Sequence, residues 1–447
     1  MENYSLLLDA FHFSYTSSDL WYYIGKPAVS DRYLLYVSVM RLQMTALLEA
    51  ILPILSEKRV PFRMARNPRV HYNLNIGKYG WNKVGKVITL YARTEQEAVE
   101  LANILLPVTQ HYSGPRINKS IQLGPALFTY LDKYPYAERH KTTLLFKGAG
   151  ILFKGSRHWI NISSRRFIGK HYLVIKTIRK SVKGNIYKAI SFINGRIKWC
   201  IIKEGRLNMV DDLFGRTIRD RLLWQKTIHD DLKHIKQIPT VWDFFDDYGD
   251  SYLVMRYVRG GTLTDKIRAI YQRNVWGALP PDQQTQLLDF YIEVLEIVDK
   301  IHQEGYIHRD IKDGNLIVLP NGKPYLLDFE LAYSAIKELP HPPFRMSANG
   351  YTAPEQLENI IPSAREDIYS MGALLFYLLT GISPKVLSID TMDAARARMK
   401  DSGLDTILID IVLLCVNKDP FNRPSIDQLI SAVTICKTGK QTLKLRR

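Results

Sequence analysis

The first third of the chain mixes strand-like and helix-like patterns of apolar positions. Residues 32–39 (RYLLYVSV) and 85–92 (GKVITLYA) are rich in β-branched and aromatic side chains, which is typical of strands. Residues 44–60 carry apolar side chains at helical spacing, with Pro53 among them. Residues 94–108 begin with a Thr followed by acidic residues, which is a helix start signal. These elements predict an α+β domain.

The pattern changes near residue 170, where strands precede helices. Three strands are predicted within 171–205 and another at 251–258, with a helix near 212–235. After residue 281 helical periodicity dominates, and the predicted helices are 283–304, 367–380, 403–416 and 425–436. The predicted domains are therefore an α+β domain at 1–140, a connector at 141–170, a strand-rich lobe at 171–260 and a helix-rich lobe at 261–447.

Bulk composition indicates a folded chain with more than one core. It has 447 residues, of which 46% are hydrophobic and 23% charged, so two or three domains are expected. The longest apolar run, 371–382, is too short for a membrane span, and the N-terminus lacks signal-peptide features. The three cysteines are widely separated and form no metal-ligand spacing. A cytoplasmic protein without a transmembrane segment is predicted.

The net charge favours an anionic partner. The chain has 61 basic and 44 acidic residues, and the difference is +17. An acidic peptide, ATP, nucleic acid or a membrane surface would each suit this charge. Plain solubility is the alternative, because the charge is spread and concentrates only in the tail at 436–447. We interpret that tail as a frayed end and expect no nucleic-acid partner.

The segment IHRDIKDGNLIV at 307–318 carries many polar groups between apolar residues. This pattern fits neither a buried strand nor an amphipathic helix, so a loop is predicted. It contains the run H-R-D followed, five residues after Asp310, by Asn315. Asp328 follows 18 residues after Asp310, within LLDFE, where Glu330 replaces the Gly of a D-F-G motif. This spacing is similar to that of the catalytic loop and metal-binding Asp of protein kinases.

Further matches follow in the order that protein kinases have them. WCIIKE gives Lys203, GYTAPEQ resembles the A-P-E segment with Glu355, and EDIYSMG gives Asp367. DPFNRPS gives Arg423, which in kinases pairs with the A-P-E glutamate. Five ordered matches between 203 and 425 make the resemblance specific, whereas a single D-x-x-x-x-N would not be.

Phosphoryl transfer requires a metal for the phosphates, a cation on the nucleotide and a group that accepts the hydroxyl proton. By resemblance, Asp310 is the base or orienting group and Lys312 steadies the transferring phosphate. Asn315 and Asp328 would hold Mg²⁺. The remaining contacts to ATP would come from Lys203, Gly184, Met255 and Tyr257, with the nucleotide between the two lobes near strand 251–258.

Two positions depart from the kinase pattern. The segment 179–189, where the glycine-rich loop is expected, offers only Gly184. The predicted helix that should supply a glutamate to Lys203 has Gln225 there instead. Glu204 is next to Lys203 in a strand and should face the other side of the sheet. A pseudokinase is the alternative, although the strand Lys and both metal ligands are present.

The N-terminal region narrows the family. The segments LLEAILPILSEKRVPFRMARNP, GKVITLYARTEQEAVELANILLPV and GPRI resemble the phospho-Ser/Thr lyase-like domain of class III and IV lanthipeptide synthetases. The kinase of those enzymes phosphorylates Ser and Thr of a ribosomally made precursor peptide, and the lyase then eliminates phosphate. The kinase pattern ends near 436, which leaves no room for the cyclase domain of this family.

The lyase residues are altered. The Lys-x-His pair of the family strand is replaced by Leu34 and Tyr36, and the proton-abstracting Lys by Arg63. Arginine stays protonated and is a poor base. Retained phosphate or peptide binding is therefore favoured over elimination. The basic residues expected to contribute are Arg63, Arg66, Lys78, Lys86 and Arg116.

The leading interpretation is an ATP- and Mg²⁺-dependent Ser/Thr kinase acting on the Ser/Thr core of a precursor peptide whose leader it binds. A complete kinase–lyase dehydratase, a non-catalytic peptide-binding scaffold and a signalling Ser/Thr kinase are the alternatives. The resemblance is compatible with separate lyase or cyclase proteins as partners and with a homodimer.

Overall fold

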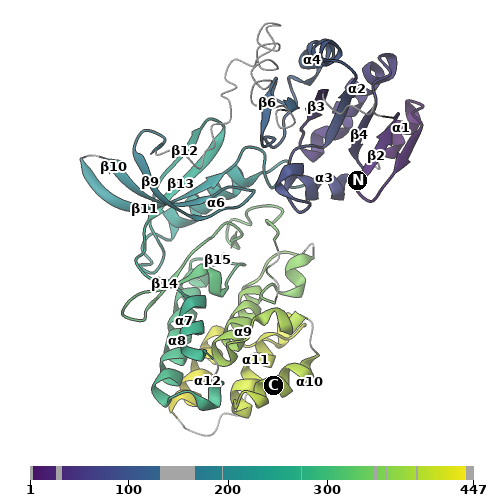
Figure 1. Ribbon diagram of the computed structural model, residues 1–447. Helices are drawn as coiled ribbons and strands as arrows, with labels where there is room; N and C mark the ends of the chain where they lie inside the picture. The colour runs from purple at the N-terminus through teal and green to yellow at the C-terminus, as the bar shows by residue number, and fades with distance from the viewer. Residues whose placement is uncertain are drawn as a thin grey trace. The chain divides into compact units, whose positions relative to one another are not determined.

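The computed structural model divides into two compact units, whose elements are labelled in Figure 1. Unit one comprises residues 1–222 and 243–254, and unit two comprises 223–242 and 255–447. The structure describes residues 4–26, 33–130, 167–193, 195–272, 274–346, 348, 350–358, 360–388 and 391–438. The predicted connector at 141–170 and the basic tail therefore lie almost entirely outside the described residues.

Unit one begins with a seven-stranded antiparallel sheet in the order β1-β2-β4-β5-β3-β7-β6. Its strands are β1 (Tyr15–Ser17), β2 (Trp21–Ile24), β3 (Tyr33–Val37), β4 (Phe62–Ala65), β5 (Ile88–Ala92), β6 (Ser120–Gln122) and β7 (Leu127–Tyr130). The strands predicted at 32–39 and 85–92 are confirmed as β3 and β5.

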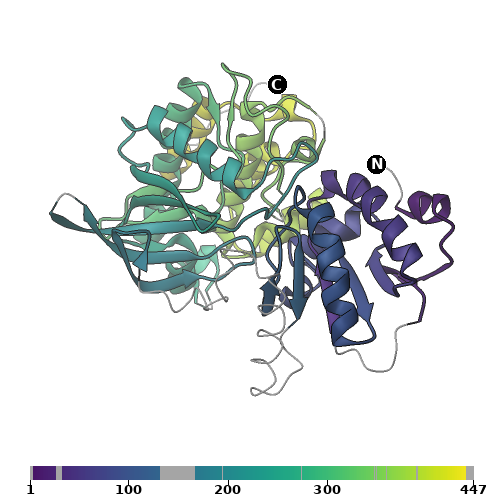
Figure 2. The same ribbon diagram turned by 90° about the horizontal axis from the view of Figure 1, so that it is seen from above.

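Helices cover one face of this sheet, and Figure 2 shows them beside its strands. They are α1 (Ser5–Ala10), α2 (Met44–Glu57), α3 (Pro68–Asn75) and α4 (Glu95–Thr109). The Thr94 hydroxyl accepts from Glu97 N at 3.1 Å and caps α4, as its sequence predicted. Apolar residues of α2 and α4 pack with Leu35 and Val37 of β3, because alternate residues of a strand face the same side.

A second sheet in unit one has the order β12-β13-β11-β10-β9-β8. Its strands are β8 (Phe167–Ile168), β9 (Tyr172–Arg179), β10 (Ile186–Ile193), β11 (Arg196–Gly205), β12 (Val241–Asp247) and β13 (Asp250–Arg256). All four predicted strands are present. Helix α6 (Ile218–Asp231) is shorter than the predicted 212–235, because the Asp212 carboxylate accepts from Phe214 N and Arg216 N and holds a turn before the helix.

Two ion pairs join the two sheets of unit one. Arg41 donates through N and Nε to the Asp211 carboxylate at 3.1 and 3.0 Å, and Arg116 Nη1 lies 2.9 Å from Asp250 Oδ2. Both carboxylates have only 1% of their side-chain surface exposed. Burial raises the pKa of Asp250, and the Arg116 charge acts in the opposite direction. Arg116 therefore favours the ionised form of Asp250 against the effect of burial.

Unit two is built around helices α8 (Pro281–Gln303) and α9 (Ala364–Thr380), which pack side by side. Every residue of α9 from Glu366 to Thr380 is buried, as expected for the apolar run at 371–382. The other helices are α7 (Leu263–Tyr271), α10 (Met392–Asp401), α11 (Thr406–Cys415) and α12 (Ile426–Thr438). The short strands are β14 (Gly261–Thr262), β15 (Tyr306–Ile307), β16 (Leu316–Val318), β17 (Pro324–Leu326) and β18 (Tyr333–Ser334).

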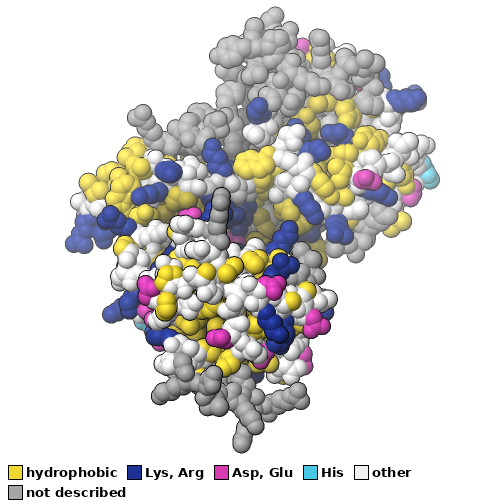
Figure 3. Space-filling model, turned by 60° about the horizontal axis from the view of Figure 1, so that its bottom comes forward, with side chains coloured by type: hydrophobic (Ala, Val, Ile, Leu, Met, Phe, Trp, Pro, Cys, Tyr) yellow, Lys and Arg dark blue, Asp and Glu magenta, His cyan; other side chains and the backbone are white. Residues whose placement is uncertain are grey.

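Among the described residues, no helix is both long and apolar enough to cross a membrane. Lys and Arg side chains lie at several separate places on the face in Figure 3 and do not gather in one patch. This agrees with the spread of charge along the sequence.

Replacing Arg116 with Ala is expected to destabilise unit one. The substitution leaves the buried Asp250 carboxylate without its guanidinium, and breaking such a pair costs about 3 kcal/mol or more. Urea denaturation followed by tryptophan fluorescence measures the loss. The control is Arg219→Ala, whose pair with Asp246 is about half exposed and should contribute under about 1 kcal/mol. Equal losses in the two variants would show that the Arg116 pair has no special role.

Candidate active site

The hairpin of β16 and β17 brings Asn315 and Asp328 together. Leu316 pairs with Leu326, and Leu327 N donates to Asn315 O at 2.8 Å. Asn315 precedes the first strand and Asp328 follows the second, so the antiparallel register places both at the same end of the hairpin. Residues 13 positions apart in sequence thus become neighbours.

Asp310 lies in the loop before this hairpin, with its carboxylate held by two residues. Lys312 Nζ is 2.6 Å from Oδ1 and 2.7 Å from Oδ2. Asn315 Nδ2 donates to both the carbonyl oxygen and Oδ2 of Asp310 at 2.8 Å. Burial raises the pKa of Asp310 to about 6, with Lys312 opposing and Asp328 adding to the rise. The structure therefore brings three of the predicted catalytic and metal-binding residues into direct contact.

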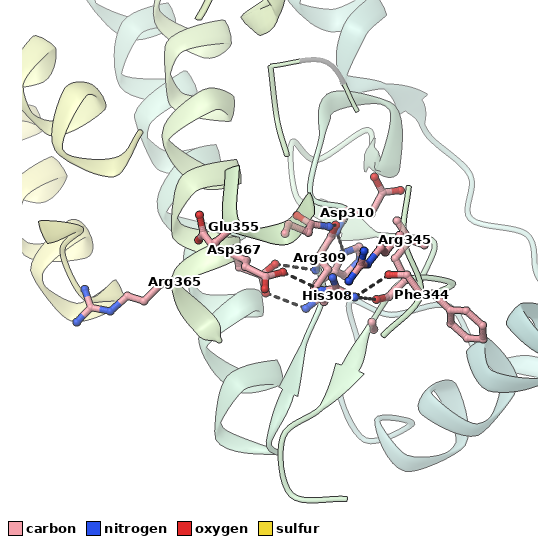
Figure 4. Close-up of polar contacts among 12 residues, drawn as sticks. His308, Arg309, Asp310, Phe344, Arg345, Glu355, Arg365 and Asp367 are labelled. Atoms are coloured by element: carbon pink, nitrogen blue, oxygen red, sulfur yellow. Dashed lines mark hydrogen bonds and ion pairs between the residues drawn. The ribbon is translucent and has the colours of Figure 1, made fainter. Parts of the chain in front are cut away.

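The loop is anchored by Asp367 at the start of α9, as Figure 4 shows. Its carboxylate accepts from His308 N at 2.8 Å and from Arg309 N at 2.7 Å, and His302 Nε2 lies 2.8 Å away. Burial works to raise the pKa of Asp367, but the bond from His302 and the positive charges nearby keep it below its usual value. The ionised carboxylate thus fixes two successive backbone N–H groups before Asp310.

Two residues of the site have a positive φ that side chains disfavour. Arg309 has a φ of 63° and Asp328 a φ of 65°. Such backbone costs about 1–3 kcal/mol per residue and persists only where surrounding contacts impose it. Strain of this kind gathers at functional sites, and here it affects the residues beside and within the predicted catalytic set.

Phe329 orients the segment that carries Asp328. Its ring is fully buried and lies 4.5 Å from the His308 ring and 5.1 Å from the His229 ring of α6. His308 Nε2 also lies 3.0 Å from Leu327 O. Glu330, which replaces the glycine of the kinase motif, is buried after Phe329. The packing of Phe329 thus fixes the residue that follows Asp328 in the core of unit two.

The predicted pair of Arg423 and Glu355 is confirmed. Arg423 Nη2 lies 2.9 Å from Glu355 Oε2, and Nη1 contacts the other carboxylate oxygen. The guanidinium is fully buried and also donates to Arg365 O at 2.8 Å. The pair joins the segment after the loop to the short helix before α12.

Lys203 and Gly184 lie in unit one. Lys203 is in β11, opposite Ile186 of β10, and the adjacent Glu204 is buried and accepts from Asn185 N at 2.8 Å. Gly184 has a φ of 147°, and a Cβ there would overlap the Glu204 carbonyl oxygen. Close packing of the β9–β10 turn on β11 therefore explains this glycine without a ligand. Its predicted contact with a phosphate stays a prediction.

Gln225, Met255 and Tyr257 belong to unit two. Gln225 of α6 is fully buried, with Nε2 3.2 Å from His229 Nε2 and 3.9 Å from Met255 Sδ. Met255 is buried at the end of β13, and Tyr257 is half-buried just beyond it. The amide that takes the place of the kinase glutamate thus contacts a residue predicted to line the nucleotide site.

Leu34, Tyr36 and Arg63, which the sequence resemblance aligns with lyase residues, share one face of the N-terminal sheet. Thr89 of β5 pairs with both Tyr36 of β3 and Arg63 of β4, so the three residues form a row across the sheet. Arg63 Nε donates to Thr89 Oγ1 at 3.4 Å, and Lys86 Nζ lies 4.6 Å from the centre of the Tyr36 ring. Leu34 is on the same face, opposite the helices. The positions assigned from sequence are therefore spatial neighbours.

The remaining predicted basic residues differ in their surroundings. Arg66 and Lys78 are exposed, and Lys86 is half-buried. Arg116, expected to bind phosphate or peptide, is engaged with Asp250 and the Tyr248 carbonyl, which gives it a structural role. Sequence reasoning also missed Thr89 and Glu366, since neither matches a motif.

The helix-rich unit, with its Asp310 loop anchored on Asp367 and its Glu355–Arg423 pair, has the features of a protein kinase. Residues 196–433, more than half of the chain, match the protein kinase domain family, and the chain belongs to that family. Residues 13–138 match the family described as RamC, N-terminal domain.

Similar proteins of known class are Ser/Thr kinases. Serine/threonine-protein kinase C from Synechocystis is 27% identical over 52% of this chain and 43% of its own length. Serine/threonine-protein kinase PknA from Nostoc is 28% identical over 50% of this chain and 40% of its own length. Serine/threonine-protein kinase PrkC from Bacillus subtilis is 27% identical over 57% of this chain and 39% of its own length. The chain thus spans less than half the length of these relatives.

Gly184→Ala is expected to lower the free energy of unfolding of unit one by more than about 1 kcal/mol. The new Cβ would overlap the Glu204 carbonyl, and the positive φ disfavours any side chain. Thermal unfolding measures the effect. Gly195→Ala in the same unit is the control, because its φ of 68° is also positive but a Cβ there meets nothing within 4 Å. Unchanged stability of the Gly184 variant would mean that the turn can move away from β11 without cost.

Proposed function

We propose that this chain is an ATP- and Mg²⁺-dependent Ser/Thr kinase that phosphorylates a precursor peptide. The observation that carries the proposal is the Asp310 carboxylate, held by Lys312 and Asn315 on a loop anchored by Asp367. Membership of the protein kinase family and the likeness to Ser/Thr kinases support the same activity.

Asp310 would orient the substrate hydroxyl and accept its proton. Its pKa of about 6 leaves the carboxylate mostly ionised at neutral pH, as an acceptor must be. Lys312 Nζ contacts both carboxylate oxygens, so its charge lies beside the reacting hydroxyl and can stabilise the transferring phosphoryl group. The two residues thus have complementary tasks at one place.

The donor set fits Mg²⁺ and nucleotide phosphates. When bound, ATP supplies the phosphoryl group and Mg²⁺ neutralises charge on its phosphates. Asn315 uses its amide nitrogen on Asp310, which leaves the amide oxygen for a cation, and Asp328 adds a carboxylate. Mg²⁺ is commonly held by one or two such oxygens together with phosphates. Lys203 would bind the phosphates, and Gly184, Met255 and Tyr257 would complete the nucleotide contacts.

The N-terminal domain is proposed to bind the peptide. Its match to the RamC N-terminal domain supports a role in lanthipeptide-type biosynthesis. Arg63, with Lys86 beside Tyr36, offers positive charge on the sheet face opposite the helices, and Arg66 and Lys78 add exposed charge. Such a face suits an acidic leader or a phosphorylated product. Separate lyase or cyclase proteins would complete the pathway.

We do not expect this domain to eliminate phosphate from the peptide. β-Elimination needs a base at the α-carbon and an acid at the leaving oxygen. An arginine is a poor general base, and the Nε of Arg63 donates to Thr89 Oγ1. The phenol of Tyr36 is a weaker acid than the imidazolium of the histidine in the family motif. Both groups can bind an anion, but neither matches the proton-abstracting task.

Asp310→Asn is expected to reduce peptide phosphorylation at least about a thousandfold, because the amide cannot accept the hydroxyl proton. Mass spectrometry of a candidate Ser/Thr-rich peptide with ATP–Mg²⁺ measures it, with a gain of one phosphate per modified residue. Asp393→Asn, an exposed position on α10, is the control. Full activity of the Asp310 variant would rule out the assigned site, and a binding-only wild type would support a scaffold.

Arg63→Ala is expected to weaken phosphopeptide binding about tenfold, corresponding to one lost charge-assisted hydrogen bond. Fluorescence anisotropy of a labelled synthetic phosphoserine peptide reports the affinity. Arg69→Ala, exposed on α3, is the matched control. The same peptide incubated with wild-type protein should keep its phosphate. Efficient conversion to dehydroalanine would instead establish a dehydratase with another acid and base.

A further inference from the structure

Arg309, the residue before Asp310, has a buried guanidinium that is hydrogen-bonded within unit two. Its Nε donates to Glu366 Oε2 at 2.8 Å, and Nη1 donates to Phe344 O at 2.9 Å and Leu331 O at 3.3 Å. The side chains of Arg309 and Glu366 are 2% and 3% exposed. Figure 4 shows Arg309 reaching Phe344 beside Asp367. One buried cation thus holds both ends of the segment 331–344.

Charge balance at this place comes from within the chain. Glu366 and Asp367 both begin the buried helix α9, and they face Arg309, His302 and His308. Burial raises the pKa of Glu366, while the Arg309 charge favours its ionised form. Asp367 is committed to the backbone of the loop, so Glu366 supplies the carboxylate that Arg309 requires.

The segment offers few positions for a phosphate. Between 331 and 346 the only hydroxyl-bearing residues are Tyr333 and Ser334. Both are buried in β18, which pairs with β15. Thr352, farther along, accepts from Ala348 N at 2.7 Å. Ser347 lies outside the described residues and is the position to test directly.

In many kinases a phosphate added to this segment orders it through new pairs with arginine. In this chain Arg309 Nε already donates to a carboxylate of the protein itself, that of Glu366. We propose that Glu366 is a positioning residue that replaces such a phosphate, so that the segment 331–344 and the Asp310 loop are held in place without phosphorylation. This inference rests on the proposed kinase activity for its catalytic readout only.

The first experiment uses the full chain before and after treatment with a broad-specificity protein phosphatase. Complete dephosphorylation is verified by intact mass. The expected result is a kcat for peptide phosphorylation within about twofold of the untreated protein, and the same for Ser347→Ala. A loss of activity on dephosphorylation that returns after incubation with ATP–Mg²⁺ would overturn the proposal.

The second experiment compares Glu366→Gln with Glu366→Asp. The glutamine variant removes the charge from a buried pair and should lower kcat about tenfold or more. The KM for ATP should change much less, and aspartate should restore part of kcat. Glu358→Gln, an exposed carboxylate in the same region, is the control. A glutamine variant with wild-type kcat would contradict the assigned role.

Hydrogen–deuterium exchange separates this inference from the proposed function. Amides at 331–346 should exchange faster in Glu366→Gln than in wild type, whether or not a peptide is phosphorylated. If the wild-type chain phosphorylates no peptide but Glu366→Gln still exchanges faster than wild type, the kinase activity is rejected and the positioning role stands. Unchanged exchange in a folded variant would reject the positioning role and leave the kinase activity standing.

Discussion

The carboxylate of Asp367 is the constraint on which the rest of the site depends. A buried charge is unfavourable unless donors surround it, and here His308 N, Arg309 N and His302 all point to it. Asp367 is itself immobile, because the helix that carries it is buried along nearly its whole length. The hydrogen bonds to Asp367 therefore fix the backbone before Asp310 to the buried helix α9. This backbone in turn positions the side chain of Asp310.

This anchor explains why strained residues persist beside it. The positive φ of Arg309 is imposed by its backbone N–H on Asp367 and its side chain on Glu366. The positive φ of Asp328 follows a hairpin whose register is fixed by Leu316 and Leu326 and precedes a fully buried Phe329. Contacts in the core thus offset the local cost of the positive φ at Arg309 and Asp328.

Sequence reasoning found the parts of the site that depend on spacing and missed those that depend on packing. Asp310, Asn315 and the Arg423–Glu355 pair follow from motif order, and α9 follows from its apolar run. Glu366 was not identified, because an acidic residue in the first turn of a helix ordinarily indicates only a favourable dipole contact. The contact of Gly184 with a phosphate stays a prediction, and the close approach of Gly184 to the Glu204 carbonyl is a packing role that its sequence does not reveal. Strands of three or four residues, such as β1 and β4, are too short to show alternation.

The row of Tyr36, Thr89 and Arg63 in the N-terminal sheet bears on the proposed binding of an anion. Tyr36 and Arg63 flank Thr89 in one row, so their position relative to each other is fixed by strand pairing and survives a change of residue type. Proton transfer requires a pKa near the working pH, which neither arginine nor an ordinary tyrosine has. Anion binding requires only donors, and a permanently charged guanidinium is better suited to it than a lysine that must be deprotonated for catalysis. On the proposed function, the residues at these positions would therefore favour binding of an anion over transfer of a proton.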